Sequence, residues 1–331
     1  MKKFLGILLS ALMLLASISF AGCGSKVDVM IYTSTEDYTI EYMGNCFKEV
    51  FPDYNIQIEY MGTSDIAAKV LNEGTSSDCD IIFGEEYGYV EKLKEAGVLA
   101  DLSSMYDYSV FTEESLNTSA KDYLLPSLKT GGAVIINNKV LTDRGIAKPT
   151  SYADLLDAKY QGLVSMPSPK SSGTGYMFYL SLVNEMGEQE ALTYFNNLTP
   201  NIQAYTSSGS GPVNKLKQRE VAVGFGMISQ AVDAINTGST ELEILVFDEG
   251  SPFNLYGTSI VKGKENNEKV KAVMDYFYST FIDAVDERYY PEPVLKNKSY
   301  SVTNYPAGID YSDMSNNTLS RKEGLLAKWS H

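Results

Sequence analysis

Short apolar runs alternate with amphipathic stretches along most of the chain, and this alternation restricts the fold more than any other feature. Val27–Tyr32 is the first strand candidate, and a helical pattern from about Thr39 to Phe51 follows it and ends at Pro52. Further strand candidates lie at 55–60, 80–83, 131–137, 163–166, 221–225, 243–247 and 255–261, and further helical patterns at 65–72, 86–95, 152–156, 176–186, 190–198 and 268–281. The alternation predicts an α/β fold with mainly parallel sheets and flanking helices, whose ligands bind at the carboxyl ends of the strands.

The N-terminus reads as a secretory signal of the lipoprotein type over residues 1–22. Lys2 and Lys3 precede an apolar run, and small residues lead into Cys23, which we expect to be lipidated. Phe20 stands where such signals usually have leucine. A membrane-spanning anchor is the alternative, because the run approaches the roughly 17–25 residues that cross a bilayer. Either way, we expect an extracytoplasmic protein that is attached to the cell membrane.

Length and charge limit the architecture and the partners. Removal of residues 1–22 would leave 309 residues, more than one core usually serves, so we expect two lobes, joined by strands because no flexible linker is evident. The formal net charge would change from −15 to −17 with the loss of Lys2 and Lys3. Such an acidic chain disfavours nucleic acid and anionic lipid as partners. Cys46 and Cys79 are expected to be separate, mostly buried thiols.

The residues needed for common enzyme chemistry are scarce. The single histidine is His331, which excludes histidine-based triads and His-rich metal sites, and no CxxC or HExxH motif occurs. The run from Gly257 to Gly263 and Lys264 is one residue too long for a P-loop, and Glu265 replaces the required Ser or Thr. We therefore expect a binding protein with no cofactor and no metal. An extracellular hydrolase that uses paired carboxylates stays open, since 42 acidic residues always offer pairs.

Small hydroxyl residues and glycines gather at three places where strands end and helices begin. Such residues can cap a helix, or they can direct hydroxyls and free N–H groups toward a bound anion. Three loops at equivalent places favour an oxyanion pocket built from neutral donors and helix dipoles. The candidate residues in these loops are Ser34, Thr35, Ser172, Gly173, Thr174, Gly175, Ser208 and Gly209.

Several segments resemble the solute-binding proteins of ABC importers, in the group of ferric-ion, 2-aminoethylphosphonate and sugar-phosphate binders. They are VDVMIYTSTE, DCDIIFGEE, PTSYADLLDAKYQGLVSMPSPKSSGTGY, YTSSGSGP, REVAVGFGM and FDEGSPFNLYGTSIVKG, in family order across roughly residues 27–280. The resemblance implies two lobes, joined by crossing strands, that close on a solute and deliver it to a membrane permease. It places residues 23–130 and about 257–285 in lobe 1, and 131–256 and about 286–331 in lobe 2. It also implies a monomer.

The resemblance leaves the solute open. Ferric-ion members commonly carry adjacent tyrosines just after the strand that matches VAVGF, whereas this chain has Gly226–Ser229 there, and Tyr289-Tyr290 lies elsewhere. A phosphonate or phosphorylated compound such as 2-aminoethylphosphonate fits better, with Glu85 or Glu86 taking an amino group. Asp37 and Glu249 are reserve carboxylates, and Tyr87, Asn254 and Tyr256 are candidate pocket walls. A ferric ion, a sugar phosphate, and a sensor or adhesion role without a permease remain alternatives.

Overall fold

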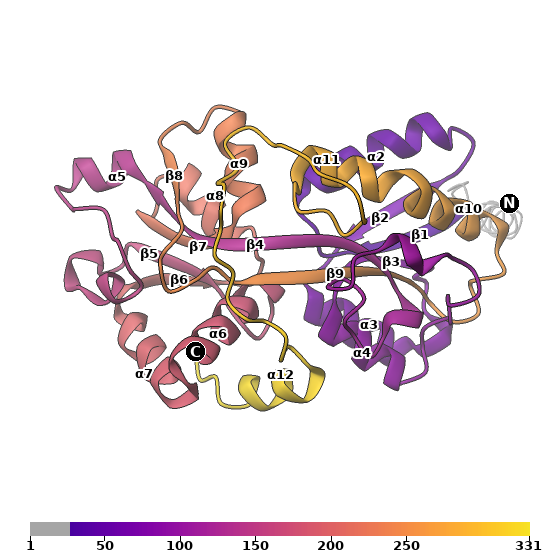
Figure 1. Ribbon diagram of the computed structural model, residues 1–331, viewed down its shortest axis with the longest axis horizontal. Coiled ribbons are helices and arrows are strands. Elements are labelled where there is room, and N and C mark those ends of the chain that lie inside the picture. The colour runs from indigo at the N-terminus through magenta and orange to yellow at the C-terminus, as the bar shows by residue number, and fades with distance from the viewer. Residues whose placement is uncertain (1–26) are drawn as a thin grey trace, which may run out of the picture.

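Two strands connect two lobes that lie side by side along the long axis of the molecule (Figure 1). They are β4, Leu125–Asn137, and β9, Phe253–Ile260, which pair in antiparallel fashion from Leu125 with Thr258 to Gly131 with Phe253. The computed structural model describes residues 27–331, so the predicted signal 1–22 and Cys23 lie outside the described residues. No helix within residues 27–331 has the length and apolarity needed to cross a membrane.

The strands form one path, in the order β2-β1-β3-β9-β4-β7-β5-β6, with β8 paired to β4. Within each lobe the outer strands are parallel: β1 pairs with β2 and β3, and β5 pairs with β6 and β7. The crossing strands are antiparallel to their neighbours β3, β7 and β8. The predicted α/β class is therefore confirmed. The remaining strands span Val29–Thr33 (β1), Ile56–Tyr60 (β2), Ile81–Glu86 (β3), Val164–Pro167 (β5), Ile202–Thr206 (β6), Val223–Met227 (β7) and Leu242–Leu245 (β8).

Helices cover the sheet in both lobes (Figure 1). The first lobe carries α2 (Asp37–Val50), α3 (Thr63–Glu73), α4 (Tyr87–Glu95), α10 (Glu268–Tyr276) and α11 (Ile282–Tyr289). The second carries α5 (Asn138–Asp143), α6 (Gly173–Met186), α7 (Glu188–Leu198), α8 (Gly211–Lys217) and α9 (Ile228–Asn236). A last helix, α12 (Leu319–Leu326), lies near both lobes. Short 3₁₀ turns occur at Gly74–Ser76, Tyr108–Val110, Lys121–Tyr123, Ala153–Leu156, Ala158–Tyr160 and Thr199–Asn201.

Local sequence explains several helix boundaries. Asn137, Asn267 and Thr318 cap α5, α10 and α12 by accepting a hydrogen bond from a backbone N–H in the first turn. The predicted helix at 268–281 is not a continuous α-helix, because a π-helical turn at Phe277–Phe281 separates α10 from α11. This turn lets Phe277 and Phe281 both pack on Phe83 of β3.

Each lobe has its own hydrophobic core. Val29, Ile31, Phe83 and Phe277 are among the residues that fill the core of the first lobe. The core of the second lobe centres on α6, which is buried from Gly173 to Val183 and is apolar nearly all round, as a fully enclosed helix must be.

The segment after α11 packs first on one lobe and then on the other. Tyr290 and Val294 belong to the core of the first lobe, and Leu295 forms a bridge with Phe111. Only later does the chain reach the second lobe, where Val302, Tyr305 and Ile309 pack near α9, and Met314, Leu325 and Trp329 join the core around α6. The two remaining cysteines are free thiols, with Cys79 buried and Cys46 half-buried.

Glycine at position 132 permits close packing where β4 passes between the lobes. A Cβ atom there would lie 2.6 Å from Met177 Cε and 2.9 Å from Phe178 Cζ, both on the buried helix α6. We predict that Gly132→Ala lowers the free energy of unfolding by about 1–3 kcal/mol, the usual cost of overpacking a core. Urea denaturation measures this change.

Gly44→Ala on α2 is the matched control, because nothing lies within 4 Å of a Cβ at that helical position. This substitution should stabilise the protein by about 0.5–1 kcal/mol, since alanine favours a helix over glycine. A Gly132→Ala protein that unfolds at the wild-type urea concentration would show that the crossing point is not tightly packed.

A candidate binding cavity between the lobes

A cavity lies between the lobes, and it and its mouth together contain about 490 Å³ of space free of protein atoms, part of which is open solvent. Its walls come from the segments that follow the carboxyl ends of the parallel strands in both lobes, which is where sheets of this kind hold ligands. Leu128 and Thr130 of β4 and Tyr256 of β9 add the crossing strands to the lining. The other lining residues are Ser34, Thr35, Glu36, Tyr60, Gly62, Thr63, Gly84, Ser171, Ser172, Gly173, Thr174, Ser207, Ser208, Gly209, Ser210 and Met227.

Hydrogen bonds fix the wall of the first lobe after β1. Thr33 Oγ1 accepts a hydrogen bond from the backbone N–H of Thr35 at 3.2 Å, and the two threonine hydroxyls lie 2.9 Å apart. Ser34 Oγ donates to the carbonyl of Gly84 at 2.9 Å. Gly84 has a φ of +69°, and a Cβ there would collide with the methyl group of Thr35. The hydroxyl loop is therefore held against the end of β3.

The wall of the second lobe begins at the N-terminus of α6. Ser172 caps this helix, because its Oγ accepts a hydrogen bond from the N–H of Gly175 at 3.4 Å. Ser171 Oγ donates to the carbonyl of Ser207 at 3.0 Å, and Gly209 packs so closely on Thr174 that a Cβ would collide with its hydroxyl. The two donor loops of this lobe thus form one surface beside the positive end of the α6 dipole.

The lobes touch around the cavity. Tyr38 on α2 donates a hydrogen bond to Ser229 Oγ on α9 at 3.1 Å. A Cβ on Gly62 would lie 3.0 Å from the carbonyl oxygen of Ser171, and Ser64 Oγ donates to the same oxygen at 3.5 Å. The two walls therefore approach each other closely in this conformation.

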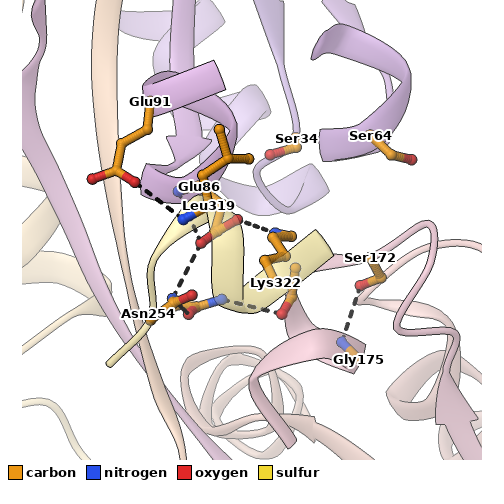
Figure 2. A network of polar contacts seen from close by, with 12 residues as sticks. Ser34, Ser64, Glu86, Glu91, Ser172, Gly175, Asn254, Leu319 and Lys322 are labelled. Atoms are coloured by element: carbon orange, nitrogen blue, oxygen red, sulfur yellow. Dashed lines mark hydrogen bonds and ion pairs between the residues drawn. The ribbon is translucent and has the colours of Figure 1, made fainter. Parts of the chain in front are cut away.

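A polar network joins the back of the cavity to the C-terminal helix (Figure 2). Asn254 Nδ2 donates to the carbonyl of Gly173 at 3.1 Å, and Asn317 Nδ2 donates to both Asn254 Oδ1 and Glu86 Oε1. Glu86 also forms an ion pair with Lys322 of α12, and both side chains are almost fully buried, at 0% and 1% exposed.

Lys322 also contacts aromatic rings from both lobes. Its ammonium nitrogen lies 3.9 Å from the ring centre of Tyr89 and 4.5 Å from that of Tyr176. Leu319 N donates to Glu91 Oε2, and Lys92 pairs with Glu323, which ties α12 to α4 of the first lobe. Arg321 and Lys328 pair with Glu188 of the second lobe. The C-terminal helix therefore bridges the lobes behind the cavity.

Most of the residues predicted from the hydroxyl and glycine loops line the cavity. They are Ser34, Thr35, Ser172, Gly173, Thr174, Ser208 and Gly209, together with Tyr256. Gly175 does not line it: its N–H is used by the Ser172 cap, and a Cβ would collide with the carbonyl of Pro167. Tyr87 also lies elsewhere, since its hydroxyl donates to the carbonyl of Ser115.

The predicted carboxylates are not part of this wall. Glu85 is fully buried, neither of its carboxyl oxygens has a hydrogen-bond partner among the described residues, and burial followed by the neighbouring Glu86 raises its pKa well above the usual range. Glu86 forms an ion pair with Lys322, so its carboxylate is already neutralised within the chain. Glu249 accepts a hydrogen bond from the N–H of Tyr152 in the second lobe, and Asp37 is exposed on the first turn of α2.

Glu36 is an acidic lining residue that the sequence patterns do not single out. It is 6% exposed, and Tyr290 donates a hydrogen bond to its Oε2 at 3.3 Å. Burial raises the pKa of Glu36 to about 7, opposed in part by hydrogen bonds and assisted by Asp37. It is the only acidic residue in the lining, and within residues 27–331 neither Lys nor Arg lines the cavity or forms an ion pair with it. In the sequence, the feature that indicates a place for Glu36 in the cavity wall is its position directly after the first hydroxyl loop.

The tyrosine pair lies outside the cavity lining. Tyr290 is buried, and its hydroxyl is shared with Thr39 at 3.1 Å and Glu36. The Tyr289 ring packs on Tyr38, with ring centres 4.6 Å apart, and its hydroxyl accepts a hydrogen bond from Arg288.

The fold and cavity define a two-lobed binding protein. Residues 75–311 match the family described as bacterial extracellular solute-binding protein, and the chain therefore belongs to this family. An uncharacterized protein of Haemophilus influenzae is 26% identical over 275 residues, which are 82% of this chain and 78% of that protein. The phosphoglycerate transport regulatory protein PgtC of Salmonella typhimurium is 20% identical over 222 residues, 66% of this chain and 53% of PgtC.

Solved structures share the fold. The periplasmic binding protein AfuA from Actinobacillus pleuropneumoniae, solved with exogenous fructose-6-phosphate bound, has a TM-score of 0.81 at 24% identity, over 92% of this chain and 98% of that one. The ferric binding protein from Campylobacter jejuni has a TM-score of 0.70 at 15% identity, over 90% and 98% of the two chains. The predicted resemblance to solute-binding proteins of ABC importers is confirmed.

We predict that Glu36→Gln stabilises the solute-free protein at pH 8 but not at pH 5. The folded protein holds the Glu36 proton up to about pH 7, whereas the unfolded chain releases it near the ordinary value of 4.5. Stability is therefore lost as the pH rises through this window, by up to about 3 kcal/mol, and the glutamine variant avoids that loss.

Urea unfolding at both pH values measures the difference, with Glu41→Gln, an exposed carboxylate of the same helix, as the control. A stability difference between wild type and Glu36→Gln that is the same at pH 5 and pH 8 would contradict a buried, titrating Glu36.

Proposed function

We propose that the protein captures a small phosphonate or phosphorylated compound, such as 2-aminoethylphosphonate, as the binding component of an ABC importer. The lobes hold the solute between them and present it to the permease subunits, and the binding protein acts as a monomer. The residues proposed to contact the anionic head are Ser34, Thr35, Ser172, Gly173, Thr174, Ser208 and Gly209.

One observation carries the proposal: hydroxyl and glycine loops from both lobes converge on one cavity whose described lining contains neither Lys nor Arg. Backbone N–H groups at the start of α6 and neighbouring hydroxyls are suitable donors for a phosphoryl or phosphonyl oxygen. Two comparison proteins support a phosphorylated solute, since one is named for phosphoglycerate transport and the other was solved with fructose-6-phosphate.

The hydrolase and ferric-ion alternatives receive less support. A hydrolase with an acidic pair needs two carboxylates at the substrate, whereas Glu36 is the only acidic residue in the described lining. Ferric ion favours several anionic oxygen ligands, and Tyr289 and Tyr290 are engaged with Arg288, Thr39 and Glu36.

We predict that Thr174→Ala weakens binding with little loss of stability. Thr174 lines the cavity, but Ser172 provides the helix cap, so the two roles can be separated. Loss of a hydrogen bond to a charged group corresponds to roughly 10- to 150-fold weaker binding. Isothermal titration with 2-aminoethylphosphonate, fructose 6-phosphate and inorganic phosphate gives the affinities, and thermal melts of the solute-free proteins give the stabilities.

Two variants complete this test. Ser172→Ala should lose both affinity and about 0.5–2 kcal/mol of stability, because it removes the cap as well. Thr193→Ala, an exposed threonine on α7, should change neither. If Thr174→Ala keeps wild-type affinity for every compound that binds, Thr174 is not a ligand residue. If Fe(III) alone binds in stoichiometric amounts, the anion proposal is wrong.

The proposed function also includes a lipid anchor at Cys23, after removal of residues 1–22. We predict that Cys23→Ser releases the protein from the membrane fraction or blocks its processing, because the lipid is attached through this thiol. Cell fractionation followed by mass measurement of the N-terminus checks this result. Cleaved Cys23→Ser protein that stays with the membranes as the wild type does would refute the anchor. A single acyl chain binds only marginally, so stable attachment implies more than one chain.

A further inference from the structure

We infer that Glu36 selects a solute that carries an ammonium group in addition to its anionic head. This inference deepens the proposed function and rests on it. Glu36 would be the residue that pairs with the ammonium group, while the hydroxyl and glycine loops hold the phosphonyl or phosphoryl group. The solute class would then be an aminophosphonate or an amino phosphate ester.

The surroundings of Glu36 lack a positive charge within the described chain. The titratable groups that face it are Asp37 and Tyr38 in the first turn of α2, Tyr60 at the end of β2, Tyr256 on β9 and Tyr290 after α11. All of these are acidic or neutral groups. A buried carboxylate that lacks a cation is costly unless it is protonated or a ligand supplies the cation.

The hydroxyl groups around Glu36 orient its carboxyl group. Tyr290 donates to Oε2, and the same hydroxyl lies 3.1 Å from Thr39 Oγ1 and 3.3 Å from the hydroxyl of Tyr38. Tyr38 in turn donates to Ser229 on the second lobe. The carboxyl group is therefore fixed from behind while its residue lines the cavity.

Three of the four buried glutamates among the described residues show different ways in which a buried carboxyl group is accommodated. Glu86 is neutralised by Lys322. Glu85 has neither a cation partner nor a place in the cavity wall, and its burial favours the protonated acid. Of these three, Glu36 alone lines the cavity, and its pKa of about 7 allows a bound ammonium group to draw it into the ionised form near neutral pH.

A solute without an ammonium group would meet the opposite electrostatic effect. Its anionic head would share the cavity with a partly ionised carboxylate, and like charges in a buried site repel each other strongly. The hydroxyl and glycine loops carry no positive charge, so they cannot offset this repulsion by forming an ion pair with the anionic head. A zwitterion presents the ammonium group to Glu36 and the oxyanion to the loops, so both charges find partners.

The test compares 2-aminoethylphosphonate with ethylphosphonate, which differs by the amino group alone, on wild type, Glu36→Gln and the control Glu41→Gln. We expect wild type to bind the amino compound about tenfold or more tightly than ethylphosphonate, the effect of a charge-assisted hydrogen bond. Glu36→Gln should lose this preference and bind ethylphosphonate at least as well as wild type does. Glu41→Gln should behave as wild type.

The pH dependence gives a second readout. In wild type the preference for the amino compound should fall from about pH 8 to about pH 5.5, because protonation of Glu36 removes its charge. The ammonium group lowers the second pKa of the phosphonate in the amino compound relative to ethylphosphonate, so the affinity ratio of Glu36→Gln, measured at each pH, is the reference for this titration. The fall that we attribute to Glu36 is the part of this pH dependence that is present in wild type and absent from Glu36→Gln.

The outcomes distinguish this inference from the proposed function. Equal binding of the two compounds by wild type, or a preference that survives in Glu36→Gln, would overturn the role of Glu36 while leaving an anion-binding importer protein in place. Tight binding of fructose 6-phosphate with no preference for the amine would do the same. If no phosphonate or phosphate compound binds, the proposed function fails and this inference fails with it. Thermal melts verify that each variant is folded.

Discussion

The antiparallel pairing of β4 with β9 is the interaction on which the rest of the structure depends. These strands carry the chain between the lobes, and Leu128, Thr130 and Tyr256 on them also line the cavity. The hydrogen-bonded register stops one strand from sliding along the other. The two lobes can therefore change their relation mainly by bending and twisting this ribbon, and the donor loops at the strand ends move as parts of rigid bodies.

Charge is distributed unevenly across the region between the lobes. Behind the cavity, Lys322 neutralises Glu86 and contacts rings from both lobes, and the amides of Asn254 and Asn317 connect this pair to the Gly173 carbonyl. Inside the cavity, the described lining offers hydroxyl groups, glycines and one acid. Glu86 and Lys322 thus neutralise each other within the chain. Under the role that we infer for Glu36, the solute supplies the positive charge that balances this carboxylate.

Local patterns in the sequence predict the strand–helix alternation and most of the donor loops, because hydroxyl and glycine residues after a strand depend on nearby residues alone. The partners of the carboxylates are harder to predict from the sequence. Glu86 is occupied by a lysine 236 positions away, and Glu249 turns to the backbone of Tyr152, and neither partner follows from spacing. Glu36 stands at the start of a helix, where an acidic residue is usually explained by the helix dipole. Its burial depends on Tyr290 and the opposite lobe, which only the tertiary structure brings near.

The position of Trp329 has a spectroscopic consequence. It is the single tryptophan of the chain, and it packs in the second lobe with ring centres 5.0 Å from both Tyr179 and Phe195 and 5.8 Å from Tyr205. Trp329 does not line the cavity. Its ultraviolet emission therefore reports whether the segment around α12 is docked on the second lobe, and solute entry alters that emission only to the extent that it disturbs this docking.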